Sequence, residues 1–231
     1  MTADARYFPV VVFDLDGTLL RGTTVLRVLA EHLGQGDAVT ELDRAFAAGE
    51  ISHRVIADRS APWFSGCTTS EMRTVLATGP WIDGIDETLQ TVSKAGTHVL
   101  LATITWRFAA ELLRERYGFA AVSGTELHRL GRALGGHVTR YFDEHDKLRF
   151  VEDWCAQHGF TLGQVAAVGD SRSDLPLFGR AGRSVALNAT PDAQRVASCV
   201  IDTEDLRDIL PLLHLPDASR PDPTSESWQR C

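Results

Sequence analysis

Two aspartates separated by one residue, Asp14 and Asp16, directly follow a short apolar segment near the start of the chain. Residues 10–13 (VVVF) are β-branched or aromatic, which is typical of a strand buried on both faces of a parallel sheet. Ligands of open α/β sheets bind at the carboxyl ends of the strands, so both carboxylates are expected at that edge. There, one can attack an electrophile and the other can exchange a proton. We expect a cation between these two negative charges, and Gly17 lets the backbone turn close to a ligand.

Polar residues also follow later predicted strands or begin a predicted helix, in the order Thr103, Lys147, Asp170 and Asp174. Taken singly, each fits an ordinary role, such as a helix-cap hydroxyl, a solvated lysine or a turn carboxylate. Their joint order at one edge of a sheet favours a single site. Carboxylates, a hydroxyl and a lysine provide the charge stabilisation and positioning on which phosphoryl transfer depends.

The elements that position these residues alternate between strands and helices, which predicts an α/β fold with a doubly wound parallel sheet. Residues 22–78 show only helical periodicity, which indicates a small helical cap inserted after the first strand. Residues 1–21 and 79–214 would form the Rossmann-like core. Residues 125–141 are expected to form a β-hairpin appended to the sheet. Residues 215–231, rich in Pro, Asp and Ser, are expected to be disordered.

The composition limits the classes of function. A net charge of −8 over 231 residues argues against a nucleic-acid partner. No apolar run is long enough to cross a membrane, and the first seven residues do not resemble a signal peptide. The four cysteines are scattered, without metal-binding or disulfide-framework spacing, and the eight histidines show no zinc-binding pattern. We therefore expect a cytoplasmic protein.

The segment D-L-D-G-T-L at residues 14–19 resembles the first motif of phosphatases of the haloacid dehalogenase superfamily. The resemblance implies that Asp14 is the nucleophile that becomes an aspartyl-phosphate and that Asp16 is the acid and base. It also implies that Thr103 binds a phosphoryl oxygen and that Lys147 neutralises nucleophile and phosphate. The implied cofactor is Mg²⁺, and the residues assigned to its site are Asp14, Asp16 (through its backbone carbonyl), Asp170 and, from nearby, Asp174.

Closer motifs are similar to the phosphoserine-phosphatase-like branch of that superfamily. The branch carries a helical cap after the first motif, a hairpin, a D-K pair like Asp146-Lys147, and stretches like those at residues 169–177 (GDSRSDLPL) and 188–191 (NATP). It implies a small phosphorylated metabolite as substrate.

Three departures from the branch bear on the substrate. Residues 103–106 read Thr-Ile-Thr-Trp, where the branch has Ser-Gly-Gly-Phe. Thr23 stands about where the phosphoserine enzymes carry a Glu that binds the substrate ammonium, and Ser173 replaces an Asn. A lost charge-assisted hydrogen bond costs about 1.5–3 kcal/mol, so a sugar, cyclitol or alcohol phosphate is expected more than phosphoserine, which stays an open alternative. The substrate-binding residues predicted in this way are Gly17, Thr23, Arg59 (with Arg54 as a substitute), Thr105 and Trp106.

Other functions fit part of the pattern. A phosphotransferase would use the same aspartyl-phosphate and deliver it to an alcohol instead of water. A non-catalytic phosphate-binding regulatory module would not need Asp16. A receiver-like signalling domain also uses Asp, Lys and Mg²⁺, but is shorter and has no helical insertion. The oligomeric state is not predicted by the sequence.

Overall fold

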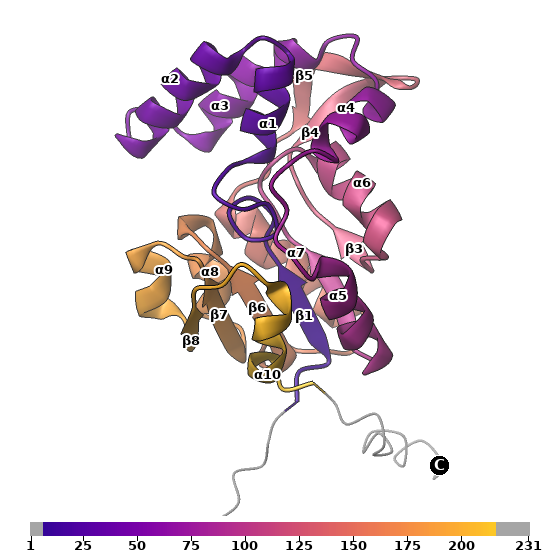
Figure 1. Ribbon diagram of the computed structural model, residues 1–231, viewed down its shortest axis with the longest axis vertical. Helices are drawn as coiled ribbons and strands as arrows, with labels where there is room; N and C mark the ends of the chain where they lie inside the picture. The colour runs from indigo at the N-terminus through magenta and orange to yellow at the C-terminus, as the bar shows by residue number, and fades with distance from the viewer. Residues whose placement is uncertain (1–6, 216–231) are drawn as a thin grey trace, which may run out of the picture.

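A computed structural model describes residues 7–215 of the chain, so residues 216–231 of the tail predicted to be disordered lie outside the described part. The chain forms two parts at opposite ends of the molecule (Figure 1). One is a sheet with its helices, and the other is a mainly helical unit made by residues 25–76. None of the helices within residues 7–215 is long and apolar enough to cross a membrane.

The six-stranded sheet confirms the predicted doubly wound α/β fold. Its strands lie in the order β3-β2-β1-β6-β7-β8, and all neighbouring pairs are parallel. β1 lies at the centre, with Val10 opposite His98 of β2 and Val165 of β6. The strands are β1 (Val10–Phe13), β2 (His98–Leu101), β3 (Ala121–Val122), β6 (Val165–Gly169), β7 (Arg183–Leu187) and β8 (Cys199–Ile201).

Both faces of the sheet are covered, which explains the uninterrupted apolar sequence of β1. Val11 and Phe13 pack into one core with helices on their side, while Val10 and Val12 pack into a second core with Val151 and Trp154. All four β1 residues are buried. The helices of this part are α5 (Ile85–Lys94), α6 (Arg107–Tyr117), α7 (Glu144–Gln157), α8 (Leu175–Phe178), α9 (Pro191–Val196) and α10 (Leu210–Leu213), with 3-10 turns η2 (Leu162–Gln164), η3 (Arg172–Asp174) and η4 (Leu206–Ile209).

The segment between β1 and α5 is helical, as its periodicity predicts. Thr24 caps α1 by accepting a hydrogen bond from the Arg27 N–H, and Thr68 and Glu71 form a capping box at α4. The buried faces of these helices join the larger core through residues such as Leu29 and Met72. The elements are α1 (Val25–His32), α2 (Gly36–Ala47), α3 (His53–Ser60), η1 (Ala61–Phe64) and α4 (Thr69–Leu76).

The hairpin prediction was right about the fold of the segment and wrong about its position. β4 (Glu126–Leu130) and β5 (Ala133–Arg140) pair antiparallel, but they form a separate two-stranded sheet and do not extend the main one. The hairpin instead bonds to the helical unit, because the Leu134 N–H donates to the Cys67 carbonyl and the Gly66 N–H donates to the Leu134 carbonyl. It lies beside α4 and α6 (Figure 1).

Candidate active site

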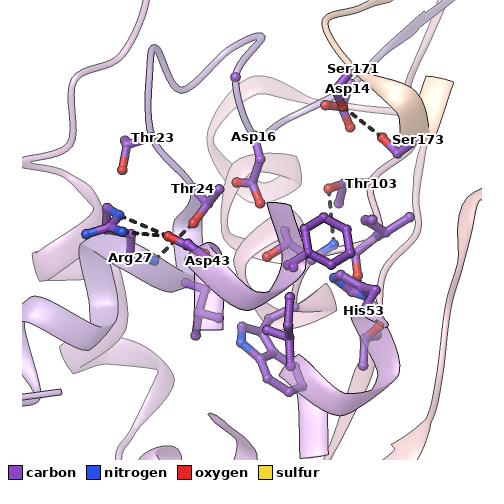
Figure 2. Close-up of a pocket in the computed structure, with 18 of the residues that line it drawn as sticks. Asp14, Asp16, Thr23, Thr24, Arg27, Asp43, His53, Thr103, Ser171 and Ser173 are labelled. Carbon is purple, nitrogen blue, oxygen red and sulfur yellow. Dashed lines mark hydrogen bonds and ion pairs between the residues drawn. The ribbon is translucent and has the colours of Figure 1, made fainter. Parts of the chain in front are cut away.

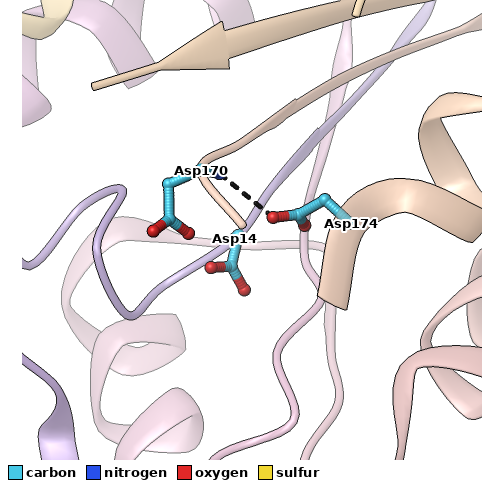
Figure 3. Close-up of side chains that lie close together, drawn as sticks. All are labelled: Asp14, Asp170 and Asp174. Carbon is cyan, nitrogen blue, oxygen red and sulfur yellow. Dashed lines mark hydrogen bonds between the residues drawn. The ribbon is translucent and has the colours of Figure 1, made fainter. Parts of the chain in front are cut away.

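The predicted nucleophile lies at the centre of the sheet. Asp14 follows β1 directly, and its backbone N–H donates to the Val168 carbonyl of β6 at 2.9 Å. Asp170 follows β6, so the two neighbouring strands deliver both carboxylates to one point, as Figure 3 shows. The parallel pairing of β1 and β6 therefore accounts for the meeting of residues that are distant in the sequence.

Lys147 bridges two of the aspartates. It lies in the first turns of α7, whose N-terminus is fixed by a capping box between Asp143 and Asp146. The Lys147 Nζ atom donates to Asp14 Oδ1 at 2.7 Å and to Asp174 Oδ1 at 2.5 Å. The three side chains are almost fully buried. Burial lowers the pKa of Lys147, but Asp14 and Asp174 outweigh it and hold that pKa above its ordinary value, so the ammonium is charged.

Asp174 has both carboxylate oxygens engaged by the protein. While Oδ1 accepts from Lys147, Oδ2 accepts from the backbone N–H groups of Asp170 (3.0 Å) and Ser171 (3.1 Å). These bonds fix the loop that carries Asp170 and fix the position of the lysine. Asp174 thus positions its neighbours, while the carboxylate of Asp170 is free to bind a cation.

The arrangement fits a divalent cation. Single oxygens of Asp14, Asp170 and Asp174 lie within 4.8 Å of one another, and the buried Oδ1 of Asp170 has no hydrogen-bond partner. Burial, together with the neighbouring carboxylates, raises the pKa of Asp170 to about 8, and burial raises that of Asp14 to about 6 despite Lys147. Carboxylate oxygens are the ligands that Mg²⁺ prefers, and such a cation would relieve this crowding of negative charge.

Gly17 is required by this geometry. Its φ of +82° is unfavourable for other residues, and a Cβ atom there would lie 2.2 Å from Asp170 Oδ2. Gly17 therefore leaves space for the carboxylate of Asp170.

Asp16 lies apart from the lysine, at the N-terminus of α1. Its Oδ1 accepts from the Val25 N–H at 2.7 Å, and the Thr105 side chain also hydrogen-bonds to it. Burial raises its pKa to about 7, to which the nearby Asp14 charge adds. A carboxyl group that titrates near neutral pH can donate a proton in one step and accept one in the next.

A cavity of about 450 Å³ opens above these carboxylates, between the sheet edge and the helical unit. Figure 2 shows Asp16 and Thr103 on one side of it, and Thr23 and Thr24 in the loop that leads into α1 on the other. Five predicted substrate or phosphate-binding residues line it: Gly17, Thr23, Thr103, Thr105 and Trp106. Trp106 is also packed edge-on against Phe64, with ring centroids 5.4 Å apart.

The predicted cap arginine does not line the cavity. Arg59 is exposed on α3 and faces the charge of Glu41 on α2. Its substitute, Arg54, is also exposed, and its guanidinium lies 4.0 Å from the centre of the Tyr141 ring. Neither position has a guanidinium at the cavity wall.

Other charged and aromatic residues complete the cavity, and the sequence patterns did not single them out. Arg27 of α1 is bound by Asp43 of α2, with Nη2 to Oδ2 at 2.6 Å. Phe46, His53, Glu144 and Arg172 also line the cavity. They come from different parts of the chain, and only the packing of the helical unit over the sheet brings them together.

Comparisons with known proteins identify the family of the chain. The sequence pattern of the family described as haloacid dehalogenase-like hydrolase matches residues 11–179. A phosphoserine phosphatase of Archaeoglobus fulgidus is 28% identical over 207 residues, covering 89% of this chain and 60% of the relative. One of Streptococcus thermophilus is 27% identical over 204 residues, covering 88% of this chain and 94% of the relative. This chain spans only half the length of the matching enzymes of Mycobacterium tuberculosis and Streptomyces coelicolor.

Solved structures show the same fold. A phosphoserine phosphatase with a phospho-aspartyl intermediate analogue superposes with a TM-score of 0.76 at 21% identity, covering 88% of this chain and 98% of the other. A HAD family hydrolase of Salmonella enterica serovar Typhi superposes with a TM-score of 0.81 at 17% identity, covering 91% and 72%.

Proposed function

Because this chain belongs to the haloacid dehalogenase-like hydrolase family, we propose that it hydrolyses a small phosphomonoester through an aspartyl-phosphate on Asp14, with Mg²⁺ as cofactor. One observation carries the proposal: a buried lysine binds the Asp14 carboxylate while Asp16, with a pKa raised to about 7, faces the same cavity. A nucleophile and a proton donor whose pKa lies near neutral pH are thereby placed at one sheet edge.

In the first step, a carboxylate oxygen of Asp14 attacks the phosphorus and the bond from phosphorus to the ester oxygen breaks. Protonated Asp16 gives its proton to the departing alkoxide, so the alcohol leaves neutral. Lys147 compensates the charge of Asp14 and of the phosphoryl group, and the Thr103 hydroxyl is placed to donate to a phosphoryl oxygen.

In the second step, Asp16, now a carboxylate, takes a proton from a water molecule that attacks the phosphorus. The bond between phosphorus and Asp14 breaks and inorganic phosphate is released, which leaves Asp14 ionised and Asp16 protonated, as they were at the start. The Val25 N–H and the Thr105 side chain hold Asp16 in place through both proton transfers.

Asp14 and Asp170 would hold Mg²⁺, with the backbone carbonyl of Asp16 as a further oxygen ligand. Bound there, the ion would supply positive charge to the phosphoryl oxygens. Asp174 would act from outside this ligand set, because its oxygens are already used to fix Lys147 and the Asp170 loop.

The cavity wall supports a hydroxyl-bearing substrate. Neutral hydrogen-bonding side chains form part of a largely apolar wall above the carboxylates, among them Thr23, Thr24, Ser60, Ser171 and Ser173. We propose a sugar, cyclitol or alcohol phosphate as the substrate class, with phosphoserine as the alternative that the curated relatives suggest. The proposed setting is the cytoplasm, with a small metabolite as partner.

The test is phosphate release from a panel of phosphomonoesters that includes phosphoserine and several sugar phosphates. Each ester is measured with Mg²⁺, with EDTA and with Asp14→Asn. We expect metal-dependent release of phosphate that the variant abolishes. Full activity of Asp14→Asn would contradict the assignment of Asp14 as the nucleophile. An added alcohol tests for transfer: a phosphorylated acceptor in place of inorganic phosphate would identify a phosphotransferase.

A further inference from the structure

Among residues 7–215, two arginines line the cavity, and they differ in whether other residues already bind their guanidinium groups. Arg27 is held by the protein itself, because Asp43 accepts from its Nε and Nη2 and Thr40 accepts from its Nη1. Arg172 lines the same cavity from the sheet side and has no carboxylate within 4.0 Å among residues 7–215. Of the two arginines, Arg172 is therefore the one whose guanidinium has no carboxylate partner within residues 7–215.

Arg172 has an ordered backbone and an exposed side chain that reaches one aromatic ring of the helical unit. Its backbone is in the 3-10 turn between Asp170 and Asp174, so it belongs to the loop that these carboxylates hold. Its guanidinium carbon lies 5.3 Å from the centre of the Phe46 ring on α2 of the helical unit. Stacking on an aromatic face orients the guanidinium plane and leaves its N–H edge free to donate. Arg172 thus spans from the sheet to the helical unit beside the site of phosphoryl transfer.

The surroundings leave Arg172 as the cationic group for a second anion. His53 lies nearby, but burial lowers its pKa to about 4, so it is neutral at pH 7. Glu144 lines the cavity without an ion pair within 4.0 Å in the described chain, and it repels anions from its own side. The two arginines predicted from the sequence for this role, Arg54 and Arg59, are outside the cavity.

We propose that Arg172 binds a second anionic group of the substrate, a carboxylate or a second phosphate, in addition to the phosphoryl group that reacts. A guanidinium donates two parallel hydrogen bonds to either oxyanion, which gives orientation as well as affinity. This inference rests on the proposed function, since it names a feature of the ester that this site would take. Arg172 lies in the 3-10 turn η3 between β6 and α8, not in the helical unit.

The test compares esters that differ only in the second anion. 3-Phosphoglycerate is paired with glycerol 3-phosphate, and fructose 1,6-bisphosphate with fructose 6-phosphate, so that the two pairs separate carboxylate from phosphate recognition. We expect kcat/KM to favour the doubly anionic member of one pair by roughly 10- to 100-fold. Arg172→Ala should remove that preference through a higher KM, and Arg172→Lys should keep part of it. Arg114→Ala, which removes an exposed guanidinium on α6 outside the cavity, is the matched control.

Two results would overturn the inference: no preference in either pair for the native protein, or a preference that Arg172→Ala leaves intact. Calorimetric dissociation constants for the same esters with Asp14→Asn, alone and combined with Arg172→Ala, separate this failure from that of the proposed function. If no ester is hydrolysed but the binding preference exists and depends on Arg172, the phosphatase proposal fails and the anion site stands. Equal binding preference with and without Arg172 rejects the anion site whatever the turnover.

Discussion

Replacing Lys147 with methionine should destabilise the protein more than any change to an exposed lysine. The substitution keeps the volume and removes the ammonium that binds Asp14 at 2.7 Å and Asp174 at 2.5 Å, leaving two nearly fully buried carboxylates without their cation. Breaking a buried pair in this way costs about 3–5 kcal/mol. Lys94, the other lysine of the chain, is exposed on α5, so Lys94→Met is the matched control and should change stability by less than about 0.5 kcal/mol.

The pH dependence of this loss follows from the carboxylates. Burial already raises the pKa of Asp14 to about 6, and removal of the lysine raises it further. A carboxyl whose folded pKa is above its unfolded value binds more protons when folded, so stability falls as pH rises through that window. The deficit of Lys147→Met should therefore be largest near pH 8 and shrink towards pH 5, where the Asp14 carboxyl is protonated.

The assay is urea unfolding of both variants and the native protein at pH 5 and pH 8 without divalent metal, with equal m-values required for the comparison. The double variant Asp14→Asn/Lys147→Met removes one of the orphaned charges and should recover part of the loss at pH 8. A deficit below about 1 kcal/mol at pH 8, or a deficit that does not change with pH, would refute the reasoning that Lys147 is the structural counter-ion of this site.

Three further predictions concern the chemistry of the site. Asp16→Asn should slow hydrolysis of alkyl phosphates by about 10²–10⁴-fold and remove the fall in native activity as pH rises through about 7. In single-turnover measurements, the first step with p-nitrophenyl phosphate should be slowed less, because its leaving group needs no proton. Equal slowing for both esters would argue against proton donation by Asp16. Gly17→Ala should raise the Mg²⁺ concentration needed for half-maximal activity, because the new Cβ would displace Asp170. The control is Gly34→Ala, at a position with a similar positive φ of +70° and open space around it, and it should leave that Mg²⁺ concentration unchanged. The same rise in both variants would assign the effect to backbone strain. Thr23→Glu should raise kcat/KM for phosphoserine relative to glycerol 3-phosphate, since Thr23 lines the cavity and a carboxylate there can pair with an ammonium; an unchanged ratio would remove Thr23 from substrate selection.

The sheet and its carboxylates were predictable because each depends on short segments of sequence. Val10–Phe13 predicts a strand buried on both faces, and the structure shows this strand at the centre of the sheet. The rule that parallel strands end at one edge then brings Asp14 and Asp170 together without any knowledge of side-chain contacts. Their meeting with Lys147 is set by α7, whose N-terminal capping box between Asp143 and Asp146 emerged from the structure.

The cavity wall was less predictable because it depends on how the helical unit packs over the sheet. The alternating pattern of residues 125–141 predicts a hairpin, but backbone hydrogen bonds between Leu134 and the loop at Gly66 and Cys67, which no local pattern encodes, join it to the helical unit. Arg172 resembles a solvated turn residue until Phe46 is placed opposite it. Arg59 has a helical position that suits a substrate contact, and only the rotation of α3 turns it towards α2.

The most direct measurement of the central claim is the mass of the protein after reaction with a phosphomonoester and rapid acid quench. Asp16→Asn with p-nitrophenyl phosphate is the combination to use, because the variant should slow hydrolysis of the intermediate more than its formation from this ester and so let it accumulate. The account predicts an added phosphoryl group on the peptide that contains Asp14, lost on treatment with hydroxylamine and absent when Asp14 is also replaced by asparagine. Phosphate release with no covalent adduct, or an adduct on another residue, would contradict the assignment of Asp14 as the nucleophile.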